Sequence, residues 1–263
     1  MGKINSQTTP ANLSLSGTQT DTLTIMTYNL HKKKYREHAE IIKSSGADIV
    51  AVQEVAGQSK FNLLKDKTGF KGKMCATANI LGVYKYRFAL LWNETKLGKP
   101  IAVTCHTIKT PKDKYDHKRG YIVAEFNDFY VIATHLSTNV DENKKIVEAI
   151  LKEDIIVNYQ KPVFIAGDLN PRPKDGNPRE SDSYETVAAL KAKGFEMLNN
   201  TDRNDPEYYT KHATRPSGGQ PDLILGYNQN PNREIIDRGV PADADRTFTI
   251  SDHLPYVVKI KFK

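Results

Sequence analysis

The chain has 263 residues, a net charge of +7, 38% hydrophobic residues and only two cysteines. These values are typical of a soluble globular protein and exclude a disulfide scaffold or a cysteine zinc site. No apolar run approaches the ~20 residues that cross a bilayer, so we expect no transmembrane segment.

Positive charge gathers in the first half of the chain. Lys and Arg outnumber Asp and Glu over residues 1–119, whereas acidic residues are in excess over residues 120–263. Basic clusters at Lys32–Arg36, Lys65–Lys73 and Lys109–Arg119 would attract polyanions such as nucleic acid or an anionic membrane surface. Each cluster is equally consistent with an ordinary solvated surface.

The N-terminal stretch, residues 1–22, is polar and has no apolar segment of the kind found in a signal peptide. We expect a flexible tail there and a single domain over residues 23–263. The tail also fits the trimmed start of an exported protein, and we favour the periplasm or secretion over the cytoplasm. Cys75 and Cys105 either pair in an oxidising compartment or remain two buried thiols.

The first predicted elements are a strand, a helix and a strand. Thr22–Leu30 alternates as a strand, Tyr35–Ser45 has apolar residues at helical spacing, and Asp48–Glu54 is apolar until its last two residues. This order indicates a parallel crossover unit. Asn29 and Glu54 then lie at the carboxyl ends of two strands, at the same edge of a sheet.

Residues 56–80 are predicted to be irregular or partly helical. Four predicted strands follow, at Arg87–Asn93, Lys99–Thr107, Tyr121–Phe126 and Phe129–Leu136. The turn signal Asn127-Asp128 joins the last two strands, and His135 lies at the end of the fourth. A basic loop that ends on Arg119-Gly120 precedes the third.

A helix is predicted over Asp141–Asn158, and a short buried strand, Val163–Ala166, follows it. This strand runs into Gly167-Asp168-Leu169-Asn170, where Gly167 would let the backbone turn tightly. Asp168 and Asn170 either share one face at the strand end or flank a turn. Ligands of open α/β folds bind beyond the carboxyl ends of strands, so this pair is a candidate site.

The last part of the chain contains a predicted helix, Ser183–Lys193, and a long loop over residues 197–219. A strand over Pro221–Leu225 follows and has Asp222 near its start. Asp252 and His253 then directly precede the final strand, Tyr256–Phe262.

Six short motifs resemble, in this order, the endonuclease/exonuclease/phosphatase superfamily, which has the deoxyribonuclease I-like fold. They are Thr27-Tyr28-Asn29-Leu30, Val52-Gln53-Glu54-Val55, Thr134-His135-Leu136, Gly167-Asp168-Leu169-Asn170, Pro221-Asp222-Leu223-Ile224 and Ser251-Asp252-His253-Leu254-Pro255. The resemblance implies an α/β (α+β) four-layer sandwich, in which two packed mixed β-sheets are flanked by helices. It also implies hydrolysis of a phosphate ester by metal-activated water.

The resemblance further implies a metal site and a base. Glu54 would bind the divalent metal, with Asn29 and Asp252 close by, and such oxygen ligands suit Mg²⁺. Mn²⁺ is an alternative, and Ca²⁺ is an alternative as a structural ion. His253 would take a proton from the nucleophilic water, with Asp222 fixing its tautomer.

Four further residues receive roles from the same resemblance. Asp168 and Asn170 would orient the phosphate, the water or a second metal. His135 would hydrogen-bond the scissile phosphate or serve the leaving group, and Arg119 would lie near the phosphate, as would Asn170. One stretch departs from the deoxyribonuclease pattern: Ala76–Gly82 has no acidic residue to pair with His135.

Elementary chemistry favours the same reading. Hydrolysis of a phosphodiester brings a nucleophile to an anionic centre, so a cation must offset charge and a base must deprotonate water. We expect a magnesium-dependent phosphodiesterase, a nuclease first, that acts as a monomer on nucleic acid or another phosphate ester. The alternatives are a phosphatase or phospholipase of inositol phosphate or sphingomyelin type, and a non-catalytic binding protein on this fold.

Overall fold

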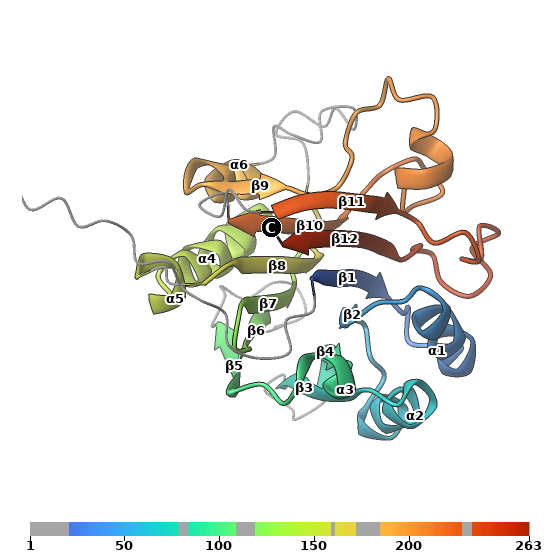
Figure 1. Ribbon diagram of the computed structural model, residues 1–263, viewed down its shortest axis with the longest axis horizontal. Coiled ribbons are helices and arrows are strands. Elements are labelled where there is room, and N and C mark those ends of the chain that lie inside the picture. The colour runs from blue at the N-terminus through green and yellow to red at the C-terminus, as the bar shows by residue number, and fades with distance from the viewer. Residues whose placement is uncertain are drawn as a thin grey trace, which may run out of the picture.

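A computed structural model describes residues 21–78, 84–108, 119–158, 161–171, 185–227 and 233–262. Two six-stranded sheets pack face to face with helices on the outside (Figure 1). Both sheets mix parallel and antiparallel pairs, which confirms the predicted α/β sandwich of two packed mixed β-sheets. The predicted tail, the basic loop at residues 109–118 and most of the Pro-rich segment lie outside the described residues.

Sheet A has the strand order β11-β12-β1-β2-β4-β3. Its strands are β1 (Thr22–Asn29), β2 (Ile49–Gln53), β3 (Lys71–Ala78), β4 (Tyr84–Trp92), β11 (Arg233–Gly239) and β12 (Tyr256–Phe262). Two helices, α1 (Tyr35–Ser44) and α2 (Gln58–Thr68), bury their apolar residues against its outer face.

Sheet B has the strand order β5-β6-β7-β8-β10-β9. Its strands are β5 (Ala102–Ile108), β6 (Arg119–Glu125), β7 (Tyr130–His135), β8 (Val163–Asp168), β9 (Phe195–Met197) and β10 (Asp222–Tyr227). Its outer face packs against α4 (Val140–Leu151), α5 (Asp154–Val157) and α6 (Glu185–Ala192). A short helix, α3 (Glu94–Leu97), follows β4, and a π-helical segment spans Tyr208–His212.

The two sheets repeat one topology. Each has a single parallel pair, β1 with β2 and β7 with β8, and each pair is joined by a helical crossover. A helix and an antiparallel hairpin follow each pair, so that β4 lies beside β2 and β10 lies beside β8. The ends of equivalent strands therefore occur at matching places in both sheets, and β1 contacts β8 (Figure 1).

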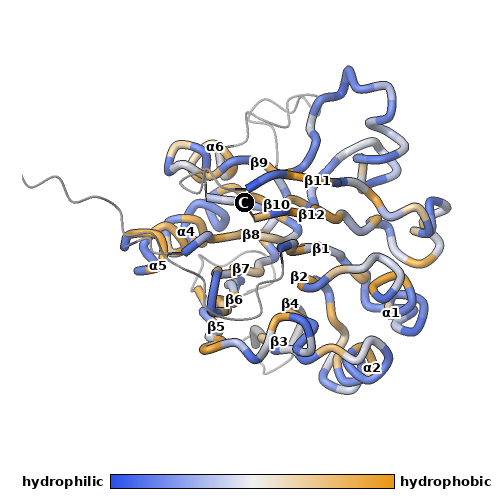
Figure 2. The backbone as a smooth tube through the Cα atoms, viewed as in Figure 1, coloured by the Kyte–Doolittle hydropathy of each residue, from blue (hydrophilic) through white to orange (hydrophobic). Residues whose placement is uncertain are grey.

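Side-chain alternation along the strands decides which residues face the space between the sheets. On β1, Leu23 and Ile25 lie in the core between the sheets, whereas Met26 and Tyr28 pack towards α1. Successive strand residues point to opposite faces, so Asn29 continues the inward row of Leu23 and Ile25. In Figure 2, hydrophobic stretches accordingly run along the central strands.

Three strands were not predicted from the sequence: β3, β9 and β11. All three lie at the edge of a sheet. Edge strands bury less surface and carry charged residues that prevent further pairing, so their apolar alternation is weak. The stretch expected to be irregular or partly helical, residues 56–80, contains both α2 and β3.

Two local expectations were wrong. The helix predicted over Asp141–Asn158 is broken into α4 and α5 at Glu153, whose carboxylate accepts a hydrogen bond from Tyr121 on β6.

Gly167 was expected to permit a tight turn, but it lies inside β8. A Cβ atom there would be 2.0 Å from the Thr134 carbonyl oxygen, so close approach of β7 and β8 explains this glycine.

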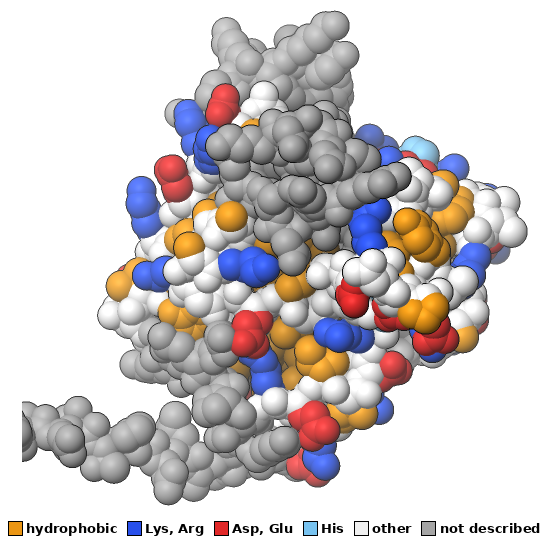
Figure 3. All heavy atoms as spheres, turned by 90° about the horizontal axis from the view of Figure 1, so that it is seen from above, with side chains coloured by type: hydrophobic (Ala, Val, Ile, Leu, Met, Phe, Trp, Pro, Cys, Tyr) orange, Lys and Arg blue, Asp and Glu red, His pale blue; other side chains and the backbone are white. Residues whose placement is uncertain are grey.

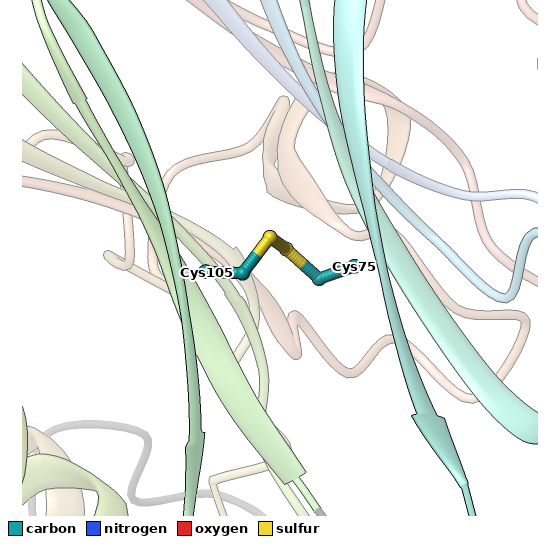
Figure 4. The surroundings of a disulfide bond; sticks show 2 residues. All are labelled: Cys75 and Cys105. Carbon is teal, nitrogen blue, oxygen red and sulfur yellow. A yellow bond between two sulfur atoms is a disulfide. The ribbon is translucent and has the colours of Figure 1, made fainter.

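A disulfide joins the two sheets. Cys75 on β3 and Cys105 on β5 have their Cα atoms 6.0 Å apart, and Figure 4 shows the bond running between the edge strands. This pairing decides between the two alternatives left open by the sequence. Among the described residues, no helix combines the length and hydropathy that crossing a membrane requires.

Reduction of the disulfide should destabilise the protein. Its cysteines are 30 residues apart, and cross-linking a loop of that size lowers the entropy of the unfolded chain. We expect the free energy of unfolding, measured with urea, to fall by about 3 to 4 kcal/mol on reduction. The Cys75→Ser/Cys105→Ser variant should have the free energy of unfolding of the reduced protein, both with and without reductant. Equal stability of the oxidised and reduced wild type would contradict this prediction.

Candidate active site

The Asn29 side chain connects the two sheets at one end of the core between them. Its amide nitrogen Nδ2 donates to Asp168 Oδ2 at 3.1 Å and to Glu54 Oε1 at 3.3 Å. Its oxygen Oδ1 accepts from the backbone nitrogen of His31 at 3.1 Å. One buried amide thus fixes a carboxylate that follows β2 of sheet A against a carboxylate that ends β8 of sheet B.

Asp168 is the point on which several side chains converge. Its Oδ2 atom lies 3.6 Å from His135 Nε2 and 3.8 Å from His253 Nε2. Its Oδ1 atom accepts the backbone N–H of Asn170 at 3.0 Å, so the two residues flank a turn. Burial raises the pKa of Asp168 to about 6, with Asp222 acting in the same direction and His253 in the opposite one.

His253 and Asp222 form a buried pair. His253 Nδ1 lies 2.7 Å from Asp222 Oδ2, and Thr214 Oγ1 donates to the same oxygen at 2.7 Å. Because the carboxylate accepts, the proton of the neutral imidazole belongs on Nδ1, and the Nε2 lone pair faces the site. Asp222 orients and polarises the ring through its contact with Nδ1, which is the arrangement that a general base requires.

Arg215 lies on the other side of the imidazole. Its NH1 atom donates to His253 Nε2 and lies 3.1 Å from Asp252 Oδ2. Burial alone would lower the pKa of His253, but Asp222 and Asp168 raise it to about 9, and Arg215 opposes them. A raised pKa favours the protonated ring, whereas a guanidinium can only donate and so requires an unprotonated Nε2. We assign the neutral ring here because the Arg215 contact leaves no room for a proton on Nε2.

Glu54 and Asp252 are the more exposed carboxylates of the site, and each has a nitrogen-bearing side chain close to it. Lys32 Nζ lies 3.8 Å from Glu54 Oε2, and His31 Nδ1 lies 3.1 Å from Asp252 Oδ1. Carboxylate oxygens are ligands that a divalent cation prefers, and a bound cation would take the place of the Lys32 and His31 contacts. Asn29 holds Glu54 by its amide nitrogen, so that side chain orients the ligand next to it.

Asp168, Asp222 and His253 form a second group that could hold a metal ion. One ligand atom from each of these residues lies within 4.8 Å of the others. However, Asp222 and His253 already bond to each other through Oδ2 and Nδ1. An ion held there would leave that bond intact if it used Asp222 Oδ1, which has no hydrogen-bond partner among the described residues, and His253 Nε2. The site therefore offers two sets of side chains that could hold a cation, this one and the carboxylates of Glu54 and Asp252.

Three further predicted residues, His135, Arg119 and Asn170, lie next to these side chains. Burial and then the Arg119 guanidinium hold the pKa of His135 well below its usual range, so its imidazole is neutral. Arg119 has 7% exposure and its NH1 donates to the His135 carbonyl oxygen at 3.4 Å. Asn170 Nδ2 donates to the Leu136 carbonyl oxygen at 3.0 Å, which fixes the turn after β8.

Unusual backbone conformations cluster around these side chains. His31, Lys32, Glu54 and Asn170 all have positive φ angles, between 40° and 58°. Asn tolerates this left-handed region, but for His, Lys and Glu it costs on the order of 1 kcal/mol each. Strain of this kind persists where surrounding bonds impose it, and it concentrates at functional sites.

The sequence analysis did not assign four residues to the site: His31, Lys32, Thr214 and Arg215. The first two directly follow the Asn29-Leu30 motif, which was a usable signal. Thr214 and Arg215 lie in the long loop before β10, and neither spacing nor alternation there distinguishes them from neighbouring polar residues.

The Asp168 carboxyl group should give stability a characteristic pH dependence. Its pKa is about 6 in the folded protein against 3.8 in the absence of burial, so the folded state binds this proton more tightly. Relative to Asp168→Asn, wild-type stability should therefore fall as pH rises through the range from about 4 to about 6. Urea unfolding in the presence of a chelator measures the difference, and parallel pH curves for the two proteins would exclude it.

Comparison with known proteins places this geometry in context. A family model described as "Endonuclease/Exonuclease/phosphatase family" matches residues 26–253. No curated protein matches the sequence.

Solved structures match over most of the chain. The endonuclease/exonuclease/phosphatase from Bacteroides vulgatus has a TM-score of 0.70 and 14% identity, over 92% of this chain and 99% of that chain. The catalytic domain of human Nocturnin, with a bound sulfate anion, has a TM-score of 0.66 and 16% identity, over 92% and 95%. An AP endonuclease from Archaeoglobus fulgidus has a TM-score of 0.63 and 17% identity, over 90% and 98%. At these identities the likeness concerns the fold alone.

Proposed function

Because the chain belongs to the endonuclease/exonuclease/phosphatase family, whose members are hydrolases that act on phosphoesters, we propose that it is a divalent-metal-dependent phosphodiesterase, and specifically a nuclease. The observation that carries this proposal is the buried His253–Asp222 pair. Its second imidazole nitrogen, Nε2, lies 3.8 Å from Asp168 Oδ2, beside the carboxylates of Glu54 and Asp252.

His253 is the proposed base. Its Nε2 atom takes a proton from a water molecule, and Asp222 stabilises the imidazolium that forms through the 2.7 Å bond to Nδ1. Asp168, which lies 3.8 Å from Nε2, orients that water for attack on phosphorus. Thr214 keeps Asp222 in place through its own bond to Oδ2.

The cation would be held by Glu54 and Asp252, with Asn29 orienting Glu54. When bound, it supplies the positive charge that offsets the charge developing on the phosphate oxygens. We propose Mg²⁺ because the ligands named are carboxylate oxygens. His135, neutral and 3.6 Å from Asp168, is placed to donate to the phosphate or to the leaving oxygen.

The basic residues beside the site support a nucleic acid substrate. His31, Lys32, Lys33 and Lys34 are exposed and lead from the site into α1, so a polyanion could contact them beyond the scissile phosphate. On the face drawn in Figure 3, cationic and anionic side chains are interspersed among the described residues, as on an ordinary solvated surface. The proposal therefore depends on this segment rather than on net charge.

The disulfide supports the proposal that this protein works in an oxidising compartment. Disulfides persist in oxidising environments and are rare in the cytosol. We propose that the protein works in the periplasm or outside the cell, where the Cys75–Cys105 bond would remain oxidised.

Substitutions of the proposed base and metal ligand should remove activity. We expect His253→Ala and Glu54→Ala to abolish Mg²⁺-dependent hydrolysis of bis-p-nitrophenyl phosphate. Asp222→Asn should lower kcat by about 10²- to 10⁴-fold, because the imidazolium loses its charged partner. Asn62→Ala, on the exposed surface of α2, is the matched control. Full activity of either alanine variant at the site would refute the assignment.

A substrate panel tests the nuclease proposal itself. Plasmid DNA, RNA, inositol phosphates, sphingomyelin and mannose 6-phosphate would each be incubated with Mg²⁺ and with chelator. Cleavage of DNA or RNA that the chelator stops is the expected result. Cleavage of monoesters alone would replace the nuclease proposal with a phosphatase. Mannose 6-phosphate is included because a mannosyl-6-phosphatase from Bacteroides thetaiotaomicron shares the fold, with a TM-score of 0.65 at 15% identity over 91% of this chain and 100% of that one.

A further inference from the structure

The Arg215 side chain occupies the position where the proposed base must work. Its NH1 atom donates to His253 Nε2 and also contacts Asp252 Oδ2 at 3.1 Å. The Nε2 lone pair that would accept a proton from water is therefore already engaged. This arrangement and a water molecule hydrogen-bonded to Nε2 exclude each other, so Arg215 has to move before hydrolysis can occur.

The backbone of Arg215 is fixed while its side chain is accessible. The backbone nitrogens of Thr214 and Arg215 both donate to the Gly219 carbonyl oxygen, at 3.0 and 3.1 Å, and the Gly218 nitrogen donates to the Arg215 oxygen at 2.9 Å. The Leu254 nitrogen donates to the Thr214 oxygen at 2.8 Å, which ties this turn to the segment that carries His253. The Arg215 side chain is 38% exposed, so its guanidinium can change partners without movement of the turn.

A phosphate group is the ligand that best fits a displaced guanidinium here. Arg presents parallel N–H donors that match two oxygens of a phosphate, and such charge-assisted bonds are strong. Arg119, by contrast, is 7% exposed and bonds to the His135 carbonyl oxygen. Of these two arginines, Arg215 is the one whose guanidinium lies at the open side of the His253–Asp252 pair.

We propose that Arg215 is a phosphate-binding residue that leaves His253 Nε2 for a non-bridging oxygen of the scissile phosphate. The substrate then releases the base on arrival, and without substrate the guanidinium keeps the lone pair engaged. This inference rests on the proposed function, since it assumes that a phosphate ester occupies the site.

Inorganic phosphate is the probe for this inference. Calorimetric titration in the presence of Mg²⁺ would compare wild type, Arg215→Ala, Arg215→Lys and the exposed control Arg246→Ala. Arg215→Ala should weaken phosphate binding about ten- to hundredfold, the range expected for loss of a charge-assisted hydrogen bond. Arg215→Lys should recover part of the affinity, and Arg246→Ala should match the wild type.

Kinetics with bis-p-nitrophenyl phosphate separate phosphate binding from a structural role. We expect Arg215→Ala to raise KM and the inhibition constant of inorganic phosphate together, by a similar factor and with an unchanged melting temperature. A structural role alone would lower the melting temperature and kcat and leave the inhibition constant unchanged. Arg215→Lys serves as the folded alternative if the alanine variant does not fold.

The outcomes distinguish this inference from the proposed function. Unchanged phosphate affinity and KM in Arg215→Ala would overturn the inference and leave the nuclease proposal intact. A wild type that hydrolyses no phosphate ester would overturn the proposed function, and calorimetry would still decide whether Arg215 binds phosphate. A wild type that does not bind inorganic phosphate would overturn the inference.

Discussion

The bridge made by the Asn29 amide between Glu54 and Asp168 is the interaction on which the site depends. Each carboxylate comes from a different sheet, and a single nitrogen atom sets their separation. Hydrophobic contact between the packed sheets has no preferred direction, so it does not by itself fix the positions of these two carboxylates relative to each other. A hydrogen bond from one donor to two acceptors does have direction, and it relates the proposed cation ligand on sheet A to the water-orienting residue on sheet B.

Strand alternation explains why these polar groups meet where they do. Asn29, His135, Asp168 and Asp222 each continue the inward-facing row of an otherwise apolar strand, so they form a polar cap on the core between the sheets. Burial of unpaired carboxylates would be unfavourable by several kcal/mol, and the cap avoids this by pairing them with imidazole, amide and hydroxyl groups. The same burial places the His253–Asp222 pair in a low-dielectric setting, where charge interactions are stronger than in water. The two sheets share one topology, so equivalent strand ends meet. The polar cap therefore contains residues from both halves of the chain.

The parts of this arrangement that could be predicted from the sequence are those in which apolar residues recur at regular spacing. Central strands alternate strongly, so their ends and the polar residues there, such as Asn29 and Asp168, were predictable. The edge strands β3, β9 and β11 were not, because little of their surface is buried and charge replaces apolar alternation. The Cys75–Cys105 pairing depends on two edge strands of different sheets meeting in space, which spacing alone does not determine. Thr214 and Arg215 were missed for a related reason: their contacts with Asp222 and His253 arise from an aperiodic loop folding back on the site.

The most direct test of this account is the rate of Mg²⁺-dependent hydrolysis of bis-p-nitrophenyl phosphate by Asn29→Ala. The substitution removes no proposed base and no carboxylate ligand, but it removes the only donor recorded between Glu54 and Asp168 among the described residues. Small misplacement of reacting groups costs about a hundredfold in rate, so we predict a loss of that order in a protein that still unfolds cooperatively. A variant as active as the wild type would contradict the claim that this bridge aligns the site.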